Sequence, residues 1–229
     1  MANQSGIQWK RVGVEAVVIV TSILLALAAD AWWEQVGDRR EEVALIEALS
    51  VTLRDDLLRV RDARDTIQFV SDGLIELEDH FATGDLRSRS DQDQQAMRAF
   101  MRFTQIEIRY APFETLKDRG LEALSNPSLR NAVTALYEEE LPRLQSNAEI
   151  DRLLSRDRIL PFKLEYFDLD TDGNWVLRGD EPEVRNRGGT LVRYRRRTLV
   201  RFFLPSFDHA IDRMNETLQL VDEELARAR

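Results

Sequence analysis

Residues 12–35 read VGVEAVVIVTSILLALAADAWWEQ, and this apolar stretch decides how the rest of the chain is organised. Its first eighteen residues carry a single charge, on Glu15. As an α-helix, twenty residues span about 30 Å, which matches the hydrocarbon core of a bilayer. Trp9 precedes the stretch and Trp32 and Trp33 close it, as indole rings do at membrane interfaces. The stretch is therefore predicted to be a transmembrane helix.

A cleaved export signal is the alternative interpretation of the same stretch. Lys10 and Arg11 supply a positive N-terminal region, and residues 26–28, reading ALA, have small side chains where a signal peptidase cuts. Against cleavage, the apolar stretch is longer than that of a usual signal, and neither glycine nor proline interrupts residues 15–36. We therefore expect an anchor, and a mature chain starting at Ala29 would contradict it.

The orientation of the anchor rests on its basic flanks. Lys10 and Arg11 lie directly before the span, whereas Arg39 and Arg40 lie several residues beyond it. Basic residues stay on the cytoplasmic side, so the two flanks compete almost evenly. The pair at the boundary favours a single-pass protein of the bacterial inner membrane, with residues 1–33 as tail and anchor and the domain on the periplasmic side.

One side of the predicted anchor helix collects small and polar side chains. At about 100° per residue, a narrow arc holds six residues that we call the packing face. They are Arg11, Glu15, Ser22, Ala26, Ala29 and Trp33. The opposite arc is aliphatic. Small residues let helices approach closely, and polar groups inside membranes face protein, so this face predicts contact with another membrane protein or a second copy. Alternatively, Glu15 lies at the interface and pairs with Arg11 one turn earlier.

The remainder of the chain, residues 34–229, is predicted to be one all-α domain. Hydrophobic residues make up 43% and charged residues 32%, and the 6 prolines and 10 glycines leave room for long helices. Residues 34–79 repeat apolar positions every three or four residues, which predicts a stalk helix that continues the anchor. The repeating residues are Ile46, Leu49, Leu53, Leu57, Val60, Ala63, Ile67, Val70, Leu74 and Leu77.

Loop-forming residues divide the rest of the domain. A loop at 82–93 precedes central helices within 94–160, where Pro112 and Gly120 bound one helix and Asn126 caps the next. An Asp-rich loop then covers 165–181, with at most a small hairpin near 162–178. A C-terminal helix covers 189–228, and Pro205 is expected to kink or restart it. The whole is expected to be an elongated helical bundle with coiled-coil-like seams.

Three aspartates form the one metal-like pattern in the sequence. Asp168, Asp170 and Asp172 precede Gly173, and carboxylates at alternate positions can converge on Ca²⁺ when glycine permits a sharp turn. The bidentate glutamate of a complete calcium loop is replaced by Gly179. A turn rich in Asp and Gly needs no metal, so calcium is the weaker interpretation and no cofactor is expected.

Charge and composition exclude several classes of function. The net charge of −9 is unfavourable for wrapping nucleic acid, and the absence of cysteine excludes thiol catalysis and thiolate metal sites. His80 and His209 lack a second histidine at helical spacing, and no nucleotide-binding or nucleophile motif occurs. We expect a protein without enzymatic activity. Seven arginines in residues 185–201 suggest either a solvated helix face or a patch for an acidic partner or anionic lipid.

Two blocks of the sequence resemble an uncharacterised family of bacterial single-pass, membrane-anchored envelope proteins with a stalk helix and a helical domain. The residues that carry the resemblance are Glu15, Asp30, Trp33, Leu116, Gly120, Leu124, Ser125 and Asn126. Asp30 stands where the family pattern has asparagine. The resemblance covers about half of the chain and implies a membrane-tethered helical domain, without an activity.

These observations predict a membrane-anchored accessory or scaffold protein that packs through its transmembrane helix into a membrane assembly. An extracytoplasmic sensor or ligand-binding helical bundle that signals through a partner is the alternative. A soluble exported binding protein would follow if the apolar stretch were cleaved.

Overall fold

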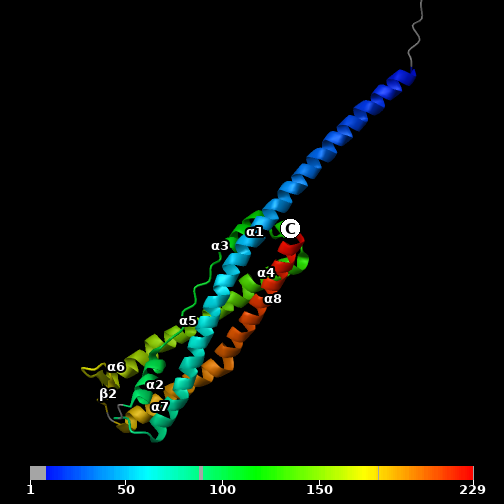
Figure 1. The fold of residues 1–229 in the computed structure, drawn as a ribbon. Helices are drawn as coiled ribbons and strands as arrows, with labels where there is room; N and C mark the ends of the chain where they lie inside the picture. The colour runs from blue at the N-terminus through cyan, green and yellow to red at the C-terminus, as the bar shows by residue number, and fades with distance from the viewer. Residues whose placement is uncertain (1–8, 88–89, 180, 229) are drawn as a thin grey trace, which may run out of the picture.

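The computed structural model describes residues 9–87, 90–179 and 181–228, and the side chains of residues 9–14 and 16 lie outside that description. About 85% of the chain is helical, which confirms the all-α fold. A helical bundle holds the core, and one long helix projects from it (Figure 1).

Helix α1 (Trp9–Thr83) runs for 75 residues from the projecting shaft to the far end of the bundle. All ten apolar residues of the predicted stalk seam are buried, because their spacing keeps them on the side that faces the other helices. The helix also passes through Gly73, where an added Cβ would lie 2.6 Å from the Cβ of Ala99. This glycine therefore allows α2 to approach α1 closely.

Within the described ranges, seven further α-helices and short irregular elements complete the bundle. The α-helices are α2 (Asp91–Met101), α3 (Ala111–Arg119), α4 (Pro127–Ala135), α5 (Leu141–Leu154), α6 (Leu160–Tyr166), α7 (Glu181–Thr198) and α8 (Leu204–Ala228). Helices α8, α2 and α7 make the most extensive contacts with α1. Helix α8 returns along α1, so the end of the chain lies near the point where the shaft leaves the bundle (Figure 1). We call this end of the bundle the shaft end and the opposite end the distal end.

Three π-helical turns lie inside otherwise continuous helical stretches. They are η2 (Leu136–Glu140), η3 (Ser155–Ile159) and η4 (Leu199–Phe203). In each case a leucine and then a proline follow the turn, the prolines being Pro142, Pro161 and Pro205. Proline lacks an N–H and its ring collides with the carbonyl four residues earlier, and the wider π turn relieves both problems. The chain therefore stays helical through Pro205 without the expected restart.

The structure corrects four sequence-based boundaries. The region 94–160 is not helical throughout, because residues 102–110 form an extended segment between α2 and α3. The C-terminal helical stretch begins at Glu181, eight residues earlier than predicted, since α7 continues through η4 into α8. The small hairpin allowed near 162–178 is present, with β1 (Phe167–Leu169) paired antiparallel to β2 (Trp175–Leu177). Residues before β1 belong to α6, and α1 extends past 79 to Thr83.

The predicted helix boundaries around Asn126 are confirmed. The side-chain oxygen of Asn126 accepts hydrogen bonds from the backbone N–H groups of Ser128 and Leu129, which have no partner inside helix α4. Pro127 is the first residue of α4, and Gly120 ends α3 with φ of +94°. A 3₁₀ turn, η1 (Leu121–Ala123), joins the two helices and places Ser125 and Asn126 beside α1 and α8.

Candidate functional site

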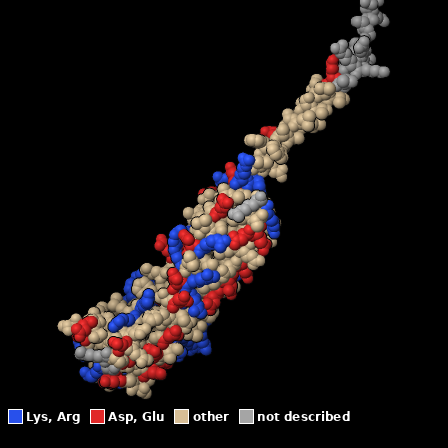
Figure 2. All heavy atoms as spheres, in the orientation of Figure 1, with Lys and Arg blue, Asp and Glu red and all other residues tan. Residues whose placement is uncertain are grey.

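The shaft of α1 is long and apolar enough to cross a membrane, and no residue of its most apolar window is buried in the bundle. Large side chains such as Leu25 and Trp33 are more than three-fifths exposed. Figure 2 shows the described shaft as almost wholly uncharged, whereas basic and acidic side chains cover the bundle. Exposed apolar surface of this extent marks an interaction site or a membrane segment. The shaft is therefore a candidate membrane span.

The packing face predicted from the sequence lies on this exposed shaft. Glu15, Ser22, Ala26, Ala29 and Trp33 are all exposed, while the side chain of Arg11 lies outside the described residues. The Ser22 hydroxyl donates to the carbonyl oxygen of Val18 at 2.8 Å, which satisfies it within the helix. No element of the described bundle covers the face, so it is accessible to another helix.

The packing face points away from the bundle. Because α1 is one uninterrupted helix, the direction of each side chain follows from the number of residues between positions, at about 100° each. The buried seam residues Ile46, Leu49 and Leu53 project on roughly the opposite side of α1 from Ala26 and Ala29. A helix docked on the packing face would therefore approach from the side of α1 that α8 does not occupy.

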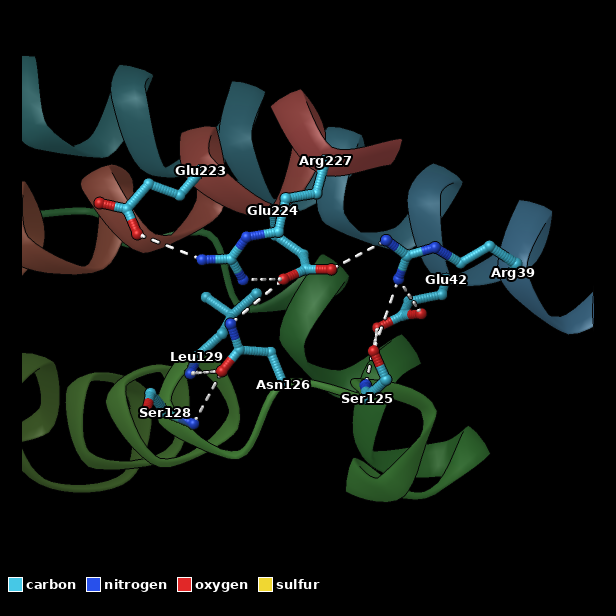
Figure 3. Close-up of polar contacts among 9 residues, drawn as sticks. All are labelled: Arg39, Glu42, Ser125, Asn126, Ser128, Leu129, Glu223, Glu224 and Arg227. Carbon is cyan, nitrogen blue, oxygen red and sulfur yellow. Dashed lines mark hydrogen bonds and ion pairs between the residues drawn. The ribbon is translucent and has the colours of Figure 1, made fainter. Parts of the chain in front are cut away.

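A polar network joins three parts of the chain at the shaft end (Figure 3). Arg39 of α1 donates to Glu42, with Nη1 and Oε2 2.6 Å apart, and to Glu224 of α8, with Nη2 and Oε1 2.8 Å apart. Glu42 accepts from the backbone N–H and hydroxyl of Ser125 at 2.6 and 2.7 Å. The Asn126 amide donates to Glu224 at 3.1 Å. The network fastens the first turns of the stalk to both α8 and the turn before α4.

The electrostatics of this network follow from its burial. Glu42 and Glu224 are 6% and 5% exposed, so their carboxylates depend on the donors around them. Hydrogen bonds from Arg39 and then Asn126 lower the pKa of Glu224, and bonds to Glu224 and Glu42 raise the pKa of Arg39. Arg227 adds a second guanidinium at 3.1 Å from Glu224. Both shifts favour the charged forms of Glu224 and Arg39.

Sequence reasoning singled out Ser125 and Asn126 but missed their acidic partners. Arg39 and Glu224 are 185 residues apart, and no local pattern marks either one. The capping position of Asn126 was the only signal, because an Asn-Pro pair predicts a helix start. That signal locates the turn without revealing what it contacts.

A groove lies beside the network, between the stalk and the α3–α4 connection. Its volume is about 840 Å³. The lining residues are Trp32, Gln35, Val36, Asp38, Arg39, Glu41, Glu42, Leu45, Arg119, Glu122, Ala123 and Ser125. Acidic side chains outnumber basic ones there, which favours a polar or cationic occupant over an anionic one.

Two of the three aspartates proposed as weak calcium ligands, Asp168 and Asp170, use their carboxylates to hold the hairpin. Asp170 accepts hydrogen bonds from the backbone N–H groups of Asp172 and Asn174 at 3.0 and 2.9 Å, and Asp168 pairs with Arg178 at 3.1 Å. Gly173 provides the positive φ of +79° that the turn requires. Among the described residues, no group of three or more acidic or histidine side chains converges to hold a metal. The structure therefore does not bring these carboxylates together as a calcium site.

A buried ion pair stabilises the middle of the bundle. Arg195 of α7 is fully buried and donates to both carboxylate oxygens of Asp151 in α5, at 3.0 and 2.8 Å. Its remaining donors reach the carbonyl oxygens of Phe100 and Arg102, where α2 ends. Each of the three guanidinium nitrogens therefore has a partner, as a buried cation requires. The arrangement joins three segments and leaves no open position for a ligand.

A second buried cation lies under the hairpin at the distal end. Lys163 of α6 is fully buried, and its Nζ lies 3.3 Å from the ring centroid of Trp175 and 3.5 Å from the carbonyl oxygen of Met97. Desolvation lowers the pKa of Lys163 to about 7. Gln94 holds Trp175 in place by bonding both its backbone N–H and its carbonyl.

The two histidines occupy separate places in the structure. His80 at the end of α1 lies 3.1 Å from Asp93, and His209 in α8 lies 3.4 Å from Glu140. Neither lines the groove beside the network, and no metal-binding group of three or more His, Asp or Glu side chains forms around either one within the described residues.

Comparisons with known proteins returned no match, whether the chain was compared with family models, curated proteins or solved structures. The family resemblance carried by Glu15, Asp30, Leu116 and the residues around Asn126 therefore stays a prediction. The argument for function rests on the geometry of the chain itself.

Proposed function

We propose that this protein is a membrane-anchored, non-enzymatic accessory or scaffold protein, and that its transmembrane helix packs into a larger assembly in the bacterial inner membrane. Residues 9–33 form the anchor, with the N-terminus inside and the bundle on the periplasmic side. The partner is another membrane protein or a second copy that contacts the packing face. The single observation that carries this proposal is the complete exposure of an apolar helix that is continuous with a well-packed bundle.

Two features of the shaft support a packing role beyond simple anchoring. Small residues lie on one side of the helix, where they let a second backbone approach, and large aliphatic residues lie on the other, where lipid would cover them. The network around Arg39 and Glu224 also fixes the stalk to the bundle at the base of the shaft. A partner bound to the shaft would therefore position the whole domain.

A matched pair of substitutions tests the packing face. Ala29→Leu adds bulk on the face, whereas Ala28→Leu adds the same atoms at the neighbouring residue, which points about 100° away toward the aliphatic side. Full-length variants are crosslinked in native membranes and purified in mild detergent. We expect Ala29→Leu, and likewise Ala26→Leu, to lose the copurifying partner that Ala28→Leu retains. Retention of the partner in all three variants would contradict the proposal.

Membrane insertion and orientation need their own measurements. The intact mass of the protein from washed membranes should correspond to the uncleaved chain, and a chain starting at Ala29 would contradict the anchor. Because the chain has no cysteine, Thr171→Cys in the exposed hairpin turn offers a single labelling site. A maleimide that cannot cross the inner membrane should label it in cells with a permeabilised outer membrane.

A sensor role is the second proposal, and the groove at the shaft end favours it. A ligand in this groove would contact Arg39 and Glu42 of the network and Trp32 at the base of the shaft. Binding there would change the orientation of the shaft relative to the bundle. A partner in the membrane that contacts the shaft would respond to this change. Arg119→Glu on the groove wall should then alter signalling without releasing the partner held by the packing face.

A further inference from the structure

We propose that the distal part of the α1–α7 surface is a self-complementary interface through which two copies of this chain associate side by side, with both shafts leaving at the same end. The interface pairs a row of arginines on one copy with a row of acidic residues on the other. The proposal concerns the bundle and does not depend on the packing face of the shaft.

The arginine row consists of Arg193, Arg197 and Arg201, which occupy successive turns of α7 and η4. All three are exposed, and none forms an ion pair or hydrogen bond with any described residue. Most other arginines in the bundle do have such partners, including Arg195 and Arg196 between them. Like charges one turn apart repel each other along a helix, so the row attracts an anionic partner.

A groove separates this row from α1. Its volume is about 440 Å³, and it is lined by the arginine row together with Arg196, Val200 and Glu78. Glu78 is the one acidic residue in the groove, and it is already bonded to Arg196 at 2.8 Å. The arginine row therefore finds no counter-charge within its own groove.

The acidic row lies on the other side of Glu78, on the solvent-facing side of α1. It consists of Asp72, Glu76 and Asp79, which fall within an arc of about 60° on the helix and are all exposed. Asp72 accepts a hydrogen bond from Gln68, and no arginine or lysine among the described residues lies within ion-pair distance of the row. Ile75 lies in the same segment and is about half exposed.

The two rows lie at matching heights along the bundle. Helices α1 and α7 run antiparallel, and the Arg196–Glu78 ion pair sets their register. Counting from this pair at about 1.5 Å per residue places Arg197 beside Leu77 and Arg201 beside Gly73. The arginine row and the acidic row therefore agree in height to within about one helical turn.

This geometry selects one type of symmetric pair. A two-fold axis parallel to the bundle keeps each residue at its own height and exchanges left with right. The arginine row of each copy then meets the acidic row of the other, and both contacts form at once. An axis across the bundle would instead oppose arginine to arginine. The favourable arrangement leaves both shafts at the same end, as two anchors in one membrane require.

Charge reversal tests this pairing in the full-length chain in mild detergent. Arg197→Glu alone and Glu76→Arg alone each create two like-charge contacts per dimer, so we expect each to weaken dimerisation by about tenfold or more. An equimolar mixture of the two variants restores both contacts in the mixed dimer and should recover the wild-type dissociation constant. Neither residue has an ion-pair partner among the described residues of its own chain, so thermal unfolding should stay unchanged.

Disulfide formation tests the contact directly in membranes. When Glu76→Cys and Arg197→Cys chains are coexpressed, mild oxidation should link them, whereas Glu47→Cys with Arg197→Cys should not. A monomeric wild type, or dimerisation unaffected by either charge reversal, would overturn the inference. If Ala29→Leu alone produced monomers while the charge variants stayed dimeric, the copies would associate through the shaft, and this surface would have another role. Recovery of dimerisation in the mixture of charge variants, together with formation of the intermolecular disulfide, would establish the interface.

Discussion

Arg39 and Glu224 join the base of the shaft to the last turns of the chain, with 2.8 Å between Nη2 and Oε1. Glu224 is buried, accepts a hydrogen bond from Asn126 and forms an ion pair with Arg227. Its negative charge therefore contributes to the stability of the fold. We expect Glu224→Gln to lower the free energy of unfolding by about 1–3 kcal/mol. Urea unfolding followed by circular dichroism measures the loss. Glu223→Gln, on the exposed side of the same turn, should change it by less than about 0.5 kcal/mol.

The same network predicts a dependence of stability on acidity. Hydrogen bonds lower the pKa of Glu224 below the value of about 4.3 found in unfolded chains. Its contribution is therefore fully present above that value and is lost as pH falls through the folded pKa. Between pH 6 and pH 3, wild type should lose more stability than Glu224→Gln. Equal losses of stability in both proteins would show that the Glu224 carboxylate does not contribute to the pH dependence.

Removing one partner of the buried ion pair should be the most damaging of the single polar changes. Asp151→Ala leaves the guanidinium of Arg195 buried without its counter-charge, at a cost of about 3–5 kcal/mol. Asp157→Ala removes a carboxylate that pairs with Arg156 on the surface, and should leave the free energy of unfolding nearly unchanged. Comparable effects of the two changes in urea unfolding would contradict the assigned role of Asp151.

Gly73 should tolerate a methyl group far less well than Gly37. The Cβ of Gly73→Ala would lie 2.6 Å from that of Ala99, so α1 and α2 must separate, at a cost of about 1–3 kcal/mol. Gly37→Ala meets nothing within 4 Å and should stabilise α1 by about 0.5–1 kcal/mol. Adding Ala99→Gly to Gly73→Ala should recover part of the loss in thermal unfolding, and no recovery would disprove the contact.

Lys163 should make the protein more stable at alkaline pH. Its folded pKa of about 7 lies below the unfolded value of about 10.4, so the unfolded chain binds more protons between these limits. Stability contributed by this residue therefore rises with pH over that range. Lys163→Met should be less sensitive to pH between 7 and 9.5 in urea unfolding. A slope identical to that of wild type would place the titration elsewhere.

The hairpin turn should be indifferent to calcium. Asp170 bonds two backbone N–H groups of its own turn, so Asp170→Ala should expose the hairpin to faster hydrogen exchange at Trp175. The midpoint of thermal unfolding of wild type should be the same with millimolar Ca²⁺ and with a chelator. A rise with Ca²⁺ that Asp170→Ala abolishes would restore the metal interpretation.

The sequence predicted the parts of this fold that depend on repetition. Burial of Ile46, Leu53 and the rest of the seam follows from spacing alone, because a helix presents every third or fourth residue to one side. The extended segment 102–110 was not foreseen, because its conformation depends on contacts with α1 and α5 that lie far away in the sequence. The π turns before Pro142 and Pro205 were missed for a similar reason, since proline predicts a break unless the surrounding packing favours a wider turn.

Whether a site could be predicted depended on how far apart its residues lie along the sequence. The packing face could be proposed from the sequence because its residues lie on one side of a single helix, and it stays a prediction. The network of Arg39, Glu42 and Glu224 was not found, because 32 basic and 41 acidic residues offer too many pairings for a sequence to rank. The same limit applied to the rows on α1 and α7, which become neighbours only when the helices pack.

Because α1 is unbroken over the described residues 9–83, the shaft and the bundle form a single lever arm. From Glu34 to Thr83 the helix extends about 75 Å at 1.5 Å per residue. A tilt of about 20°, common for membrane helices, would displace the far end of the bundle sideways by about 25 Å. A shaft that spans a membrane, as proposed, would thus convert a small change in its tilt into a large movement of the hairpin end. The contacts that set the tilt of the shaft therefore also set the position of the distal surface.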